Sequence, residues 1–463
     1  MILKNHPVAC HTDNVGPNST FVAIKGFNSD GNKFITKAIE QGATQIVLTK
    51  NSSNQKLEKQ YQNIKFIYTK NTRIKLAQLS AKALNYPANK LKIIGITGTK
   101  GKTTTSYIIE HVLRNCGLKI ALLGSIKNKI LTTETQSKLT CPESNYLHMF
   151  FDECVKQNID YVVMEVSSHA LSLDRTYGIK FNAVGFTNLA PEHMDFYKDM
   201  QEYFQAKYLL FDQAKKEGAI IINSDDAWGK KALNNLKNKD NNILGFDNKT
   251  FSIEQNNING LEIKIKNNVI IAPKLFGQFN AYNLVMSFLI CQKLGLKDNK
   301  IIDAIKTFPG VPGRLQIHTL KNNAKAFVDY AHNPSSMEAV LSVLRTMTKN
   351  LIVVFGCGGD RDKTKRPVMG KISTQYADKI IITDDNPRSE NRENILKDIL
   401  AGIEKKDLNK VTCLLDRKKA IAKAVQFSNP NSIIALLGKG HEDYYLINNK
   451  KFYLDDYKEI EKY

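Results

Sequence analysis

The sequence predicts an α/β protein of three domains: a small N-terminal α/β domain, a central domain with a P-loop and a mostly parallel sheet, and a Rossmann-like C-terminal domain. From about residue 90 onward, short buried apolar segments alternate with helical segments, which is typical of parallel sheets with helices on both faces. The 463 residues are too many for one core and fit about two to four domains. Turn-rich segments at 85–90 and 308–316 divide the chain, so we place the domains at 1–88, 89–312 and 313–463.

The N-terminal domain is predicted to contain strands at 19–24 and 44–49, with a helix in 33–43 that ends at Gly42. The apolar stretch within residues 1–14 is too short for a signal peptide, and no apolar run reaches the roughly 18 residues that span a bilayer. The seven cysteines form no C-x-x-C pair. We therefore expect a cytoplasmic protein with reduced thiols and no membrane insertion.

The central and C-terminal domains repeat the strand–helix pattern. Central strands are expected at 91–97, 119–124, 160–166, 183–189 and 218–223, with helices at 103–116, closed by Gly117, and at 279–295. The more polar stretch 243–273 is expected to form hairpins. C-terminal strands are expected at 324–331, 350–356, 378–383, 410–415 and 432–438.

A phosphate loop is the first functional motif. Residues 98–103 lie between a predicted buried strand and a predicted helix, although the commonest spacing of the motif would need glycine where Ile96 stands. Loop N–H groups and the helix N-terminus would point at phosphates. Lys102 would neutralise the β- and γ-phosphates, and the Thr103 hydroxyl would bind Mg²⁺. A plain glycine-rich turn is the alternative.

Acids and imidazoles follow two other predicted strands. Glu165 ends one strand and precedes Ser167, Ser168 and His169, while His193 and Asp195 follow another. Ligands of open α/β sheets bind at this edge, and hard cations prefer carboxylate and hydroxyl oxygens. Taken alone, Glu165 is as often a helix cap or surface acid as a metal ligand. Lone histidines are more often structural than metal-binding.

The net charge of +21 suits an acidic partner, either nucleic acid or a polyanionic small substrate. The lysines are spread along a sequence rich in Lys, Asn and Ile, and we find no nucleic-acid-binding motif. We expect no nucleic-acid partner.

Ten segments together closely resemble the Mur ligases of bacterial cell-wall synthesis, over nearly the whole chain. The best match is the branch that adds the third amino acid to UDP-N-acetylmuramoyl-L-alanyl-D-glutamate. The segments are "GITGTKGKTTT", "MEVSSHAL", "FTNLAPEHMD", "AKYLLF", "GQFNAYN", "PGRLQ", "VDYAHNPSSME", "VFGCGGDRDKTKRPVMG", "TDDNPRSE" and "LLGKGHEDY". This family uses the shorter loop G-T-x-G-K-T, which explains Ile96.

The resemblance implies an ATP-dependent ligase of peptidoglycan precursor synthesis that works through an acyl phosphate. It would act as a monomer and add meso-2,6-diaminopimelate, and so would serve cell shape and cell division. The implied catalytic residues are Lys102, Glu165, His193 and Lys207. The implied ATP-binding residues are Gly98, Thr99, Lys100, Gly101, Lys102, Thr103, Thr104, Asn283, Arg314 and Asp329, with His332 nearby.

Two Mg²⁺ ions are implied, one held by Thr103 and Glu165 and the other by Glu165 and His193. Lys207 matches a family lysine that CO₂ converts into a carbamate, a carboxylate-like metal ligand. Without the resemblance, Lys207 would be read as a surface lysine whose stem packs along an amphipathic helix.

The resemblance also implies two substrate sites. The nucleotide-sugar peptide would contact Thr140, Cys141, Ser167 and Arg175; on its own, a surface position is the less favoured alternative for Arg175. Diaminopimelate would contact Arg361, Asp385, Asn386, Pro387, Arg388, Gly438 and Glu442. Arg388 would grip the carboxylate that L-lysine lacks, and Glu442 would take the distal ammonium. By itself, the "DNPR" segment at 385–388 could be an ordinary turn.

The first domain departs most from the family. Residues 11–13 read His-Thr-Asp where the family has Asp-Ser-Arg, and the chain begins later than usual. Smaller departures are Cys141, Leu173, Glu192, Met194 and Tyr197. We expect weaker nucleotide-sugar binding than is usual for the family.

Three alternatives remain at this point. A related ligase could join L-lysine, D-alanyl-D-alanine or, as in folylpolyglutamate synthases, another amino acid. A basic phosphate-loop ATPase stimulated by nucleic acid belongs to another class. An inactive homologue would account for the altered first domain, although Lys102, Glu165, His193 and Lys207 are all present.

Overall fold

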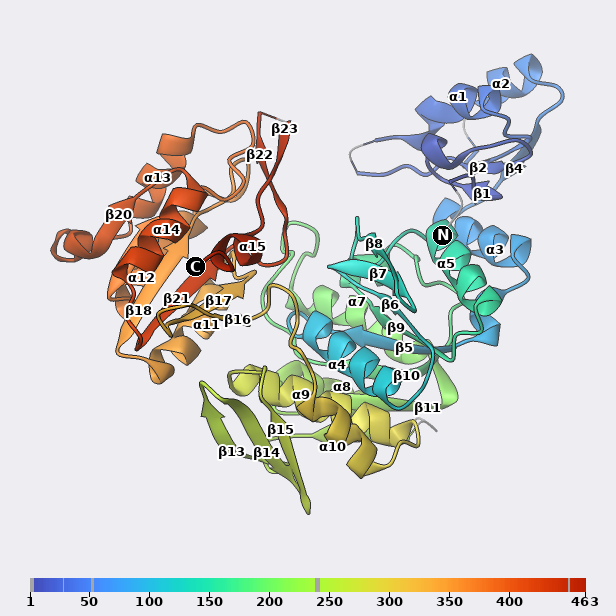
Figure 1. Cartoon of the computed structure of the whole chain (residues 1–463). Coiled ribbons are helices and arrows are strands. Elements are labelled where there is room, and N and C mark those ends of the chain that lie inside the picture. The colour runs from blue at the N-terminus through green and yellow to red at the C-terminus, as the bar shows by residue number, and fades with distance from the viewer. Residues whose placement is uncertain (1–3, 28, 51–53, 238–241, 449) are drawn as a thin grey trace. The chain divides into compact units, whose positions relative to one another are not determined.

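The chain divides into two units in the computed structural model, which describes residues 4–27, 29–50, 54–237, 242–448 and 450–463 (Figure 1). The first unit comprises Met1–Phe251 and Tyr282–Ile305, and the second comprises Ser252–Ala281 and Lys306–Tyr463. The second unit thus takes in residues that the predicted limits assign to the central domain, and those three limits stay a prediction. The expectation that residues 1–14 carry no signal peptide falls partly on residues 1–3, which lie outside the described residues.

The N-terminal part of the first unit is a parallel sheet of four strands in sequence order. The strands are β1 (Val8–Ala9), β2 (Thr20–Val22), β3 (Gln45–Leu48) and β4 (Lys65–Tyr68), and the helices are α1 (Ile35–Glu40), α2 (Asn54–Gln60) and α3 (Thr72–Ala83). Strands β2 and β3 and helix α1 are the predicted ones. The sequence analysis missed β1, which has only two residues, and β4, whose side chains are only partly buried.

The central sheet of the first unit has eight strands in the order β12-β11-β10-β5-β9-β6-β7-β8. Its strands are β5 (Lys92–Thr97), β6 (Ile120–Leu123), β7 (Lys127–Ile130), β8 (Thr133–Gln136), β9 (Tyr161–Glu165), β10 (Phe181–Phe186), β11 (Ala214–Asn223) and β12 (Asn242–Phe246). All pairings are parallel except those of β7 with β6 and β8. The five predicted central strands are present.

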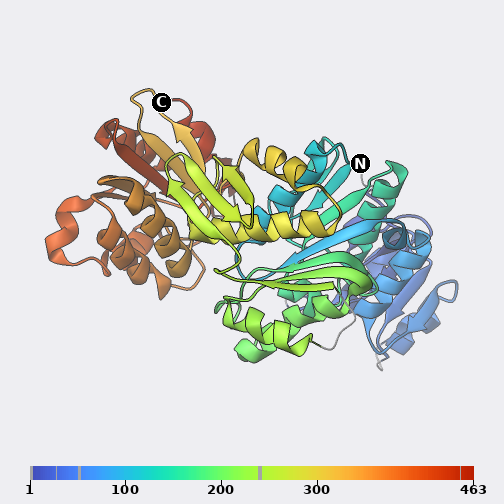
Figure 2. The same cartoon turned by 90° about the horizontal axis from the view of Figure 1, so that it is seen from below.

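Helices cover both faces of this central sheet (Figure 2). They are α4 (Lys102–Asn115), α5 (Ser144–Lys156), α6 (Ser168–Ser172), α7 (Met200–Asp212), α8 (Ala227–Asn235), α9 (Gln278–Lys293) and α10 (Asp298–Lys306). Helix α4 ends before Gly117, whose φ of +85° marks the predicted stop. The inner strands β5, β6, β9 and β10 are mostly apolar and buried, as expected for strands covered on both faces.

The second unit contains a sheet in the order β16-β17-β21-β18-β19-β20, parallel except for β16. Its strands are β16 (Gln316–Thr319), β17 (Lys325–Asp329), β18 (Asn350–Phe355), β19 (Lys379–Ile382), β20 (Val411–Cys413) and β21 (Ser432–Leu437). Its helices are α11 (Pro334–Met347), α12 (Lys365–Tyr376), α13 (Arg392–Leu400), α14 (Arg417–Phe427) and α15 (Asp456–Ile460). The five predicted C-terminal strands are β17 to β21.

Two small antiparallel sheets complete the second unit. One contains β13 (Ser252–Asn257), β14 (Gly260–Ile265) and β15 (Asn268–Ala272), and the other is the hairpin of β22 (Tyr444–Ile447) and β23 (Lys450–Tyr453). The hairpins expected in 243–273 therefore begin at 252. Residues 242–246 form β12 of the central sheet, a correction that follows from its parallel pairing with β11.

Among the described residues, no helix combines the length and the apolar character that a membrane span requires. All seven cysteines are unpaired thiols, as the absence of a C-x-x-C pair suggested.

Candidate active site

Polar side chains gather at the carboxyl ends of the parallel strands in each unit. In the first unit, the phosphate loop follows β5, Glu165 ends β9, and Thr187 follows β10. Strands β10, β5 and β9 are neighbours in the sheet, so these three positions share one edge. This is the edge at which open α/β sheets bind their ligands.

The phosphate loop is closely packed and depends on two glycines. Gly98 and Gly101 have φ angles of +143° and +86°, which side-chain-bearing residues rarely adopt. A Cβ on Gly98 would lie 1.8 Å from Oγ1 of Thr187, and one on Gly101 would lie 2.3 Å from Oδ1 of Asn283. Helix α4 starts directly after Gly101 without a side-chain cap, so its first N–H groups suit an anion.

Thr187 and Asn188 directly follow β10, and this two-residue strap holds the phosphate loop in place through hydrogen bonds. The sequence did not predict this role. The Lys100 N–H donates to Oδ1 of Asn188 (3.0 Å), and Nδ2 of Asn188 donates to the Lys100 carbonyl (3.1 Å). The Thr187 hydroxyl donates to the same carbonyl (2.6 Å), and the Thr99 N–H donates to the Asn188 carbonyl (2.8 Å). Thr187 and Asn188 directly follow a predicted buried strand, and this position was the sequence signal that could have identified them.

Two lysines converge on one carbonyl of this loop. Nζ of Lys102 donates to the carbonyls of Gly98 and Thr99, both at 2.9 Å, and Nζ of Lys207 donates to Gly98 at 2.8 Å. Lys207 is 1% exposed, so the surface reading of this residue is wrong. Burial, and secondarily the charge of Lys102, lower its pKa well below the ordinary value for lysine. Lys207 is therefore disposed to be a neutral amine.

Glu165 is the best-anchored acid of this edge. Its Oε2 accepts from the Thr103 hydroxyl (2.9 Å) and the Ser125 hydroxyl (3.0 Å), and its Oε1 accepts from the Ser125 N–H (2.8 Å). The Ser125 hydroxyl also lies 3.0 Å from Oγ1 of Thr140. Ser125 was missed, although it follows the predicted strand β6; it links the proposed metal ligand to a residue expected to contact the substrate.

His193 is held by aromatic contacts. It has a φ of +60°, a 43% exposed side chain, and a ring whose centroid lies 4.6 Å from that of His169 and 6.1 Å from that of Tyr203. Partial burial lowers the pKa of His193; Glu192 opposes this effect, while Lys207 and Lys102 add to it. A neutral imidazole can bind a metal through a ring nitrogen.

The donor set fits a nucleotide-bound cation better than a resident metal. Among the described residues, no group of three or more His, Cys, Asp or Glu side chains is arranged to hold a metal ion. Thr103 and Glu165 nonetheless place two hard oxygen donors together beside the phosphate loop. Mg²⁺ is commonly held by one or two carboxylates, water and substrate phosphates, so this pair suits it.

The residues predicted for the nucleotide-sugar peptide are largely engaged in structure. Arg175 is paired with Glu143 (2.8 Å) and donates to the Cys141 carbonyl (2.9 Å). Its side chain is only 13% exposed, so Arg175 is not a surface residue. The Ser167 hydroxyl caps α6 by accepting from the Ala170 N–H (3.2 Å). The Cys141 thiol is buried, which raises its pKa to about 12.

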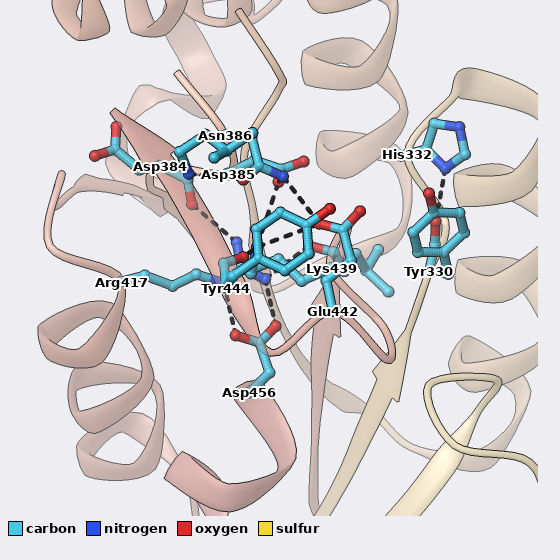
Figure 3. Close-up of polar contacts among 12 residues, drawn as sticks. Tyr330, His332, Asp384, Asp385, Asn386, Arg417, Lys439, Glu442, Tyr444 and Asp456 are labelled. Carbon is cyan, nitrogen blue, oxygen red and sulfur yellow. Dashed lines mark hydrogen bonds and ion pairs between the residues drawn. The ribbon is translucent and has the colours of Figure 1, made fainter. Parts of the chain in front are cut away.

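In the second unit, Arg314 and Asp329 lie beside Tyr330 at the end of β17. Both carboxylate oxygens of Asp329 accept backbone N–H groups, those of Leu315 (2.7 Å) and Ala331 (2.8 Å). Burial raises the pKa of Asp329, and Arg314 opposes that rise. The Arg314 guanidinium stacks over the Tyr330 ring at 4.6 Å, and His332 lies beside the same tyrosine (Figure 3).

The residues predicted for diaminopimelate come together from loops after β18, β19 and β21. Asn386 donates to Oε2 of Glu442 (2.9 Å) and to Oδ1 of Asp385 (3.0 Å) (Figure 3). A Cβ on Gly438 would lie 3.2 Å from Oδ2 of Asp385, so glycine leaves room for this carboxylate. Asp385, Asn386, Gly438 and Glu442 thus lie together at one sheet edge, and their contact with diaminopimelate stays a prediction. The buried Lys439, which joins the same group, was missed.

Arg388 has a left-handed backbone, with φ +54°, stabilised from two sides. Its N–H donates to the Leu446 carbonyl of β22 (2.9 Å), and its Nη1 donates to the Gly359 carbonyl (2.7 Å). Pro387 is buried, whereas Arg361 is exposed. The 385–388 segment is therefore a loop fixed by tertiary contacts and more than an ordinary turn.

Three family descriptions match the chain in order. They are the Mur ligase family catalytic domain over residues 5–83, the Mur ligase middle domain over 96–291, and the Mur ligase glutamate ligase domain over 313–440. This succession bears out the predicted fold class of three α/β domains.

Individual proteins are similar over nearly the full length. The UDP-N-acetylmuramoyl-L-alanyl-D-glutamate–2,6-diaminopimelate ligase 1 of Clostridium acetobutylicum is 40% identical over 462 residues, covering 96% of this chain and 92% of its own. A solved structure of a UDP-N-acetylmuramoyl-L-alanyl-D-glutamate–2,6-diaminopimelate ligase has a TM-score of 0.69 and 26% identity, covering 99% of this chain and 94% of that one. The MurF ligase from Thermotoga maritima in complex with ADP shares the fold, with a TM-score of 0.63, 16% identity and 94% coverage of each chain.

Proposed function

The chain belongs to the Mur ligase family, and we propose that it joins meso-2,6-diaminopimelate to the D-glutamate carboxylate of UDP-N-acetylmuramoyl-L-alanyl-D-glutamate, using ATP. The observation that carries this proposal is the junction of the 385–388 loop with Glu442 at one sheet edge. It occurs in a chain 40% identical to a ligase named for these substrates. The product is a peptidoglycan precursor.

The first step activates the acid. A carboxylate oxygen attacks the γ-phosphorus of ATP, a P–O bond to ADP breaks, and an acyl phosphate forms. The loop amides at 98–101, the N-terminus of α4 and the Lys102 ammonium bind the phosphates and offset their charge. The strap residues Thr187 and Asn188 keep the loop in its binding conformation.

The second step forms the amide. The amine attacks the acyl carbon, a C–N bond forms, phosphate leaves with the electrons of the C–O bond, and the amine loses a proton. Arg388 grips the distal carboxylate of diaminopimelate, and Glu442 takes the distal ammonium. L-Lysine lacks the distal carboxylate and so leaves Arg388 without a partner. This difference is the basis on which the enzyme would select diaminopimelate over L-lysine.

Mg²⁺ at Thr103 and Glu165, with a second ion at Glu165 and His193, would neutralise phosphate charge when bound. We propose that Lys207 becomes a carbamate, because burial favours its neutral amine. The Nζ lone pair would bond to the carbon of CO₂, with loss of a proton. The resulting anion would lie close to the Lys102 ammonium, which would offset its charge.

Arg175 supports the proposed nucleotide-sugar site by holding the 140–144 turn through Glu143 and the Cys141 carbonyl. Thr140 and Ser167 offer hydroxyls on the same side of the central sheet as Glu165. We propose that the enzyme acts as a monomer. We further propose that the reaction takes place in the cytoplasm, where ATP is available.

The proposal is tested by phosphate release from Mg²⁺-ATP and UDP-N-acetylmuramoyl-L-alanyl-D-glutamate, with meso-diaminopimelate, L-lysine, D-alanyl-D-alanine or no amine. We expect release only with diaminopimelate, accompanied by the tripeptide product in the mass spectrum. Release with L-lysine instead would keep the ligase and overturn the role of Arg388. The absence of phosphate release with every amine would favour an inactive homologue with an impaired first domain.

A further inference from the structure

Lys439 is a buried cation inside the amino-acid pocket. Its side chain is 0% exposed, and it follows β21 through Gly438. Nζ lies 3.4 Å from Oε2 of Glu442 and 3.9 Å from Oδ1 of Asp385, and it donates to the Tyr444 carbonyl (Figure 3). Such a charge persists in an interior only when partners surround it.

The contacts of Lys439 use one oxygen of each carboxylate. Asn386 binds the same two atoms, Oδ1 of Asp385 and Oε2 of Glu442. Within the described part of the chain, no hydrogen bond reaches Oδ2 of Asp385 or Oε1 of Glu442. The network thus turns one oxygen of each acid toward the protein and leaves the other for a ligand amine.

Lys439 also supports Arg388 through the hairpin. It is bonded to the carbonyl of Tyr444, the first residue of β22. Two residues further along β22, Leu446 accepts from the Arg388 N–H (2.9 Å) and donates to Oδ1 of Asn386 (3.0 Å). The strand that holds Arg388 in its left-handed conformation is therefore anchored at its start by Lys439.

We infer that Lys439 is a positioning residue for the incoming amino acid. It fixes Glu442 for the distal ammonium and, through β22, Arg388 for the distal carboxylate. Without it, two neighbouring carboxylates would lose their shared counter-charge and move apart. This inference rests on the proposed function, because the pocket residues are those assigned to diaminopimelate.

The test compares Lys439→Met with Lys451→Met. Lys451 is exposed, and its ammonium lies 4.0 Å from the Tyr444 ring centroid, so the control removes another lysine touching the same tyrosine. In Lys439→Met we expect the KM for meso-diaminopimelate to rise about tenfold or more, as when a buried charged partner is lost. The KM for ATP should stay within about twofold, and Lys451→Met should match wild type.

A double variant separates positioning from general support. Because Lys439 acts partly through Glu442 and partly through Arg388, Lys439→Met should raise the KM for diaminopimelate by a clearly smaller factor in Glu442→Gln than in the wild type. Additive effects, or equal losses toward ATP and diaminopimelate, would overturn the inference. Lys439→Met alone could fail to fold, because it leaves the carboxylates of Asp385 and Glu442 without their lysine. The double variant leaves only Asp385 in that state, so comparing its KM with that of Glu442→Gln still tests the inference.

The wild-type assay is read first and tests the proposed function separately. The amine that the wild type uses is then the substrate whose concentration is varied in the assays of the variants. A wild type that uses L-lysine would therefore overturn the proposed substrate, while a KM change in Lys439→Met toward L-lysine would still support Lys439.

Discussion

At the residue scale, Lys207 illustrates how burial decides chemistry. Its position in α7 allows either a surface lysine or a buried one, and the fold removes the side chain from water. The Lys102 ammonium, bonded to the same Gly98 carbonyl, makes a second positive charge there unfavourable. A neutral amine is the form of lysine that reacts with CO₂.

We predict that Lys207→Ala loses most ligase activity, by about a hundredfold, because an anion that positions the reacting groups is removed. Added short-chain carboxylic acids should restore part of it by filling the space with a carboxylate. The measurement is phosphate release with and without acetate, alongside the mass of the intact wild-type protein under CO₂. Full activity of Lys207→Ala without additives would rule out the carbamate role.

His441 is predicted to make the second unit acid-sensitive. It packs against the Tyr330 ring at 5.1 Å, and burial, with Arg314 and Lys439 nearby, lowers its pKa to about 3. Below its ordinary pKa of about 6.5, His441 binds a proton in the unfolded chain but not in the folded one. Its contribution to stability is therefore complete above about pH 6.5 and is lost as the pH falls toward 3.

The variant His441→Gln should lose that part of the pH dependence. The thermal midpoint of the wild type should fall more between about pH 7.5 and about pH 5 than that of the variant, since one proton contributes at most about 1.4 kcal/mol per pH unit. Other groups titrate equally in both proteins and cancel in the comparison. Equal falls would show that His441 is protonated in the folded state.

At the element scale, the strand–helix turns carry the function. The central parallel strands β5, β9, β10, β18 and β21 are short, mostly apolar and buried, and the polar motifs begin where strands end. Periodicity and turn residues therefore locate both the strands and the motifs in the sequence. They fail for β1 and β4, because a two-residue strand has no periodicity and a half-buried strand has a weak one.

The phosphate loop is predicted to tolerate no side chain at Gly98. In Gly98→Ala, the new methyl group would meet Oγ1 of Thr187, so the loop must move and activity should fall by about a hundredfold. Gly117→Ala is the matched control, since Gly117 also has a positive φ but a Cβ there meets nothing within 4 Å. We expect the control to lose about 1 kcal/mol of stability and to keep its activity.

Steady-state kinetics with varied ATP, together with melting curves, measure both effects. The loop model is wrong if Gly98→Ala and Gly117→Ala have the same kinetic parameters for ATP.

At the scale of the whole molecule, the net charge of +21 must be reconciled with a small anionic substrate. A basic protein binds nucleic acid weakly by charge alone, and such binding declines steeply with salt. We predict that neither DNA nor RNA stimulates phosphate release at about 0.15 M salt in the absence of the nucleotide sugar. Stimulation under those conditions would favour a nucleic-acid-dependent ATPase.

The residues assigned to the two proposed steps divide between the two units. The first unit contains the phosphate loop, Glu165 and Lys207, and the second contains Arg388, Glu442 and Lys439, which are proposed to bind the amino acid. On this proposal, activation of the acid and selection of the amine are separate tasks, which is why we expect Lys439 variants to affect one and spare the other.

The sequence by itself determined the α/β class, the phosphate loop and the edge of each sheet at which chemistry occurs, because strands, turns and motifs are local patterns. Only the tertiary structure decided which distant loops meet: Ser125 with Glu165, Asn188 with Lys100, and Lys439 with Asp385. The reason is strand order. Strand β21 lies between β17 and β18, and β9 lies between β5 and β6, so residues remote in the chain become neighbours. The burial of Lys207 likewise depends on everything packed around α7, which no local pattern encodes.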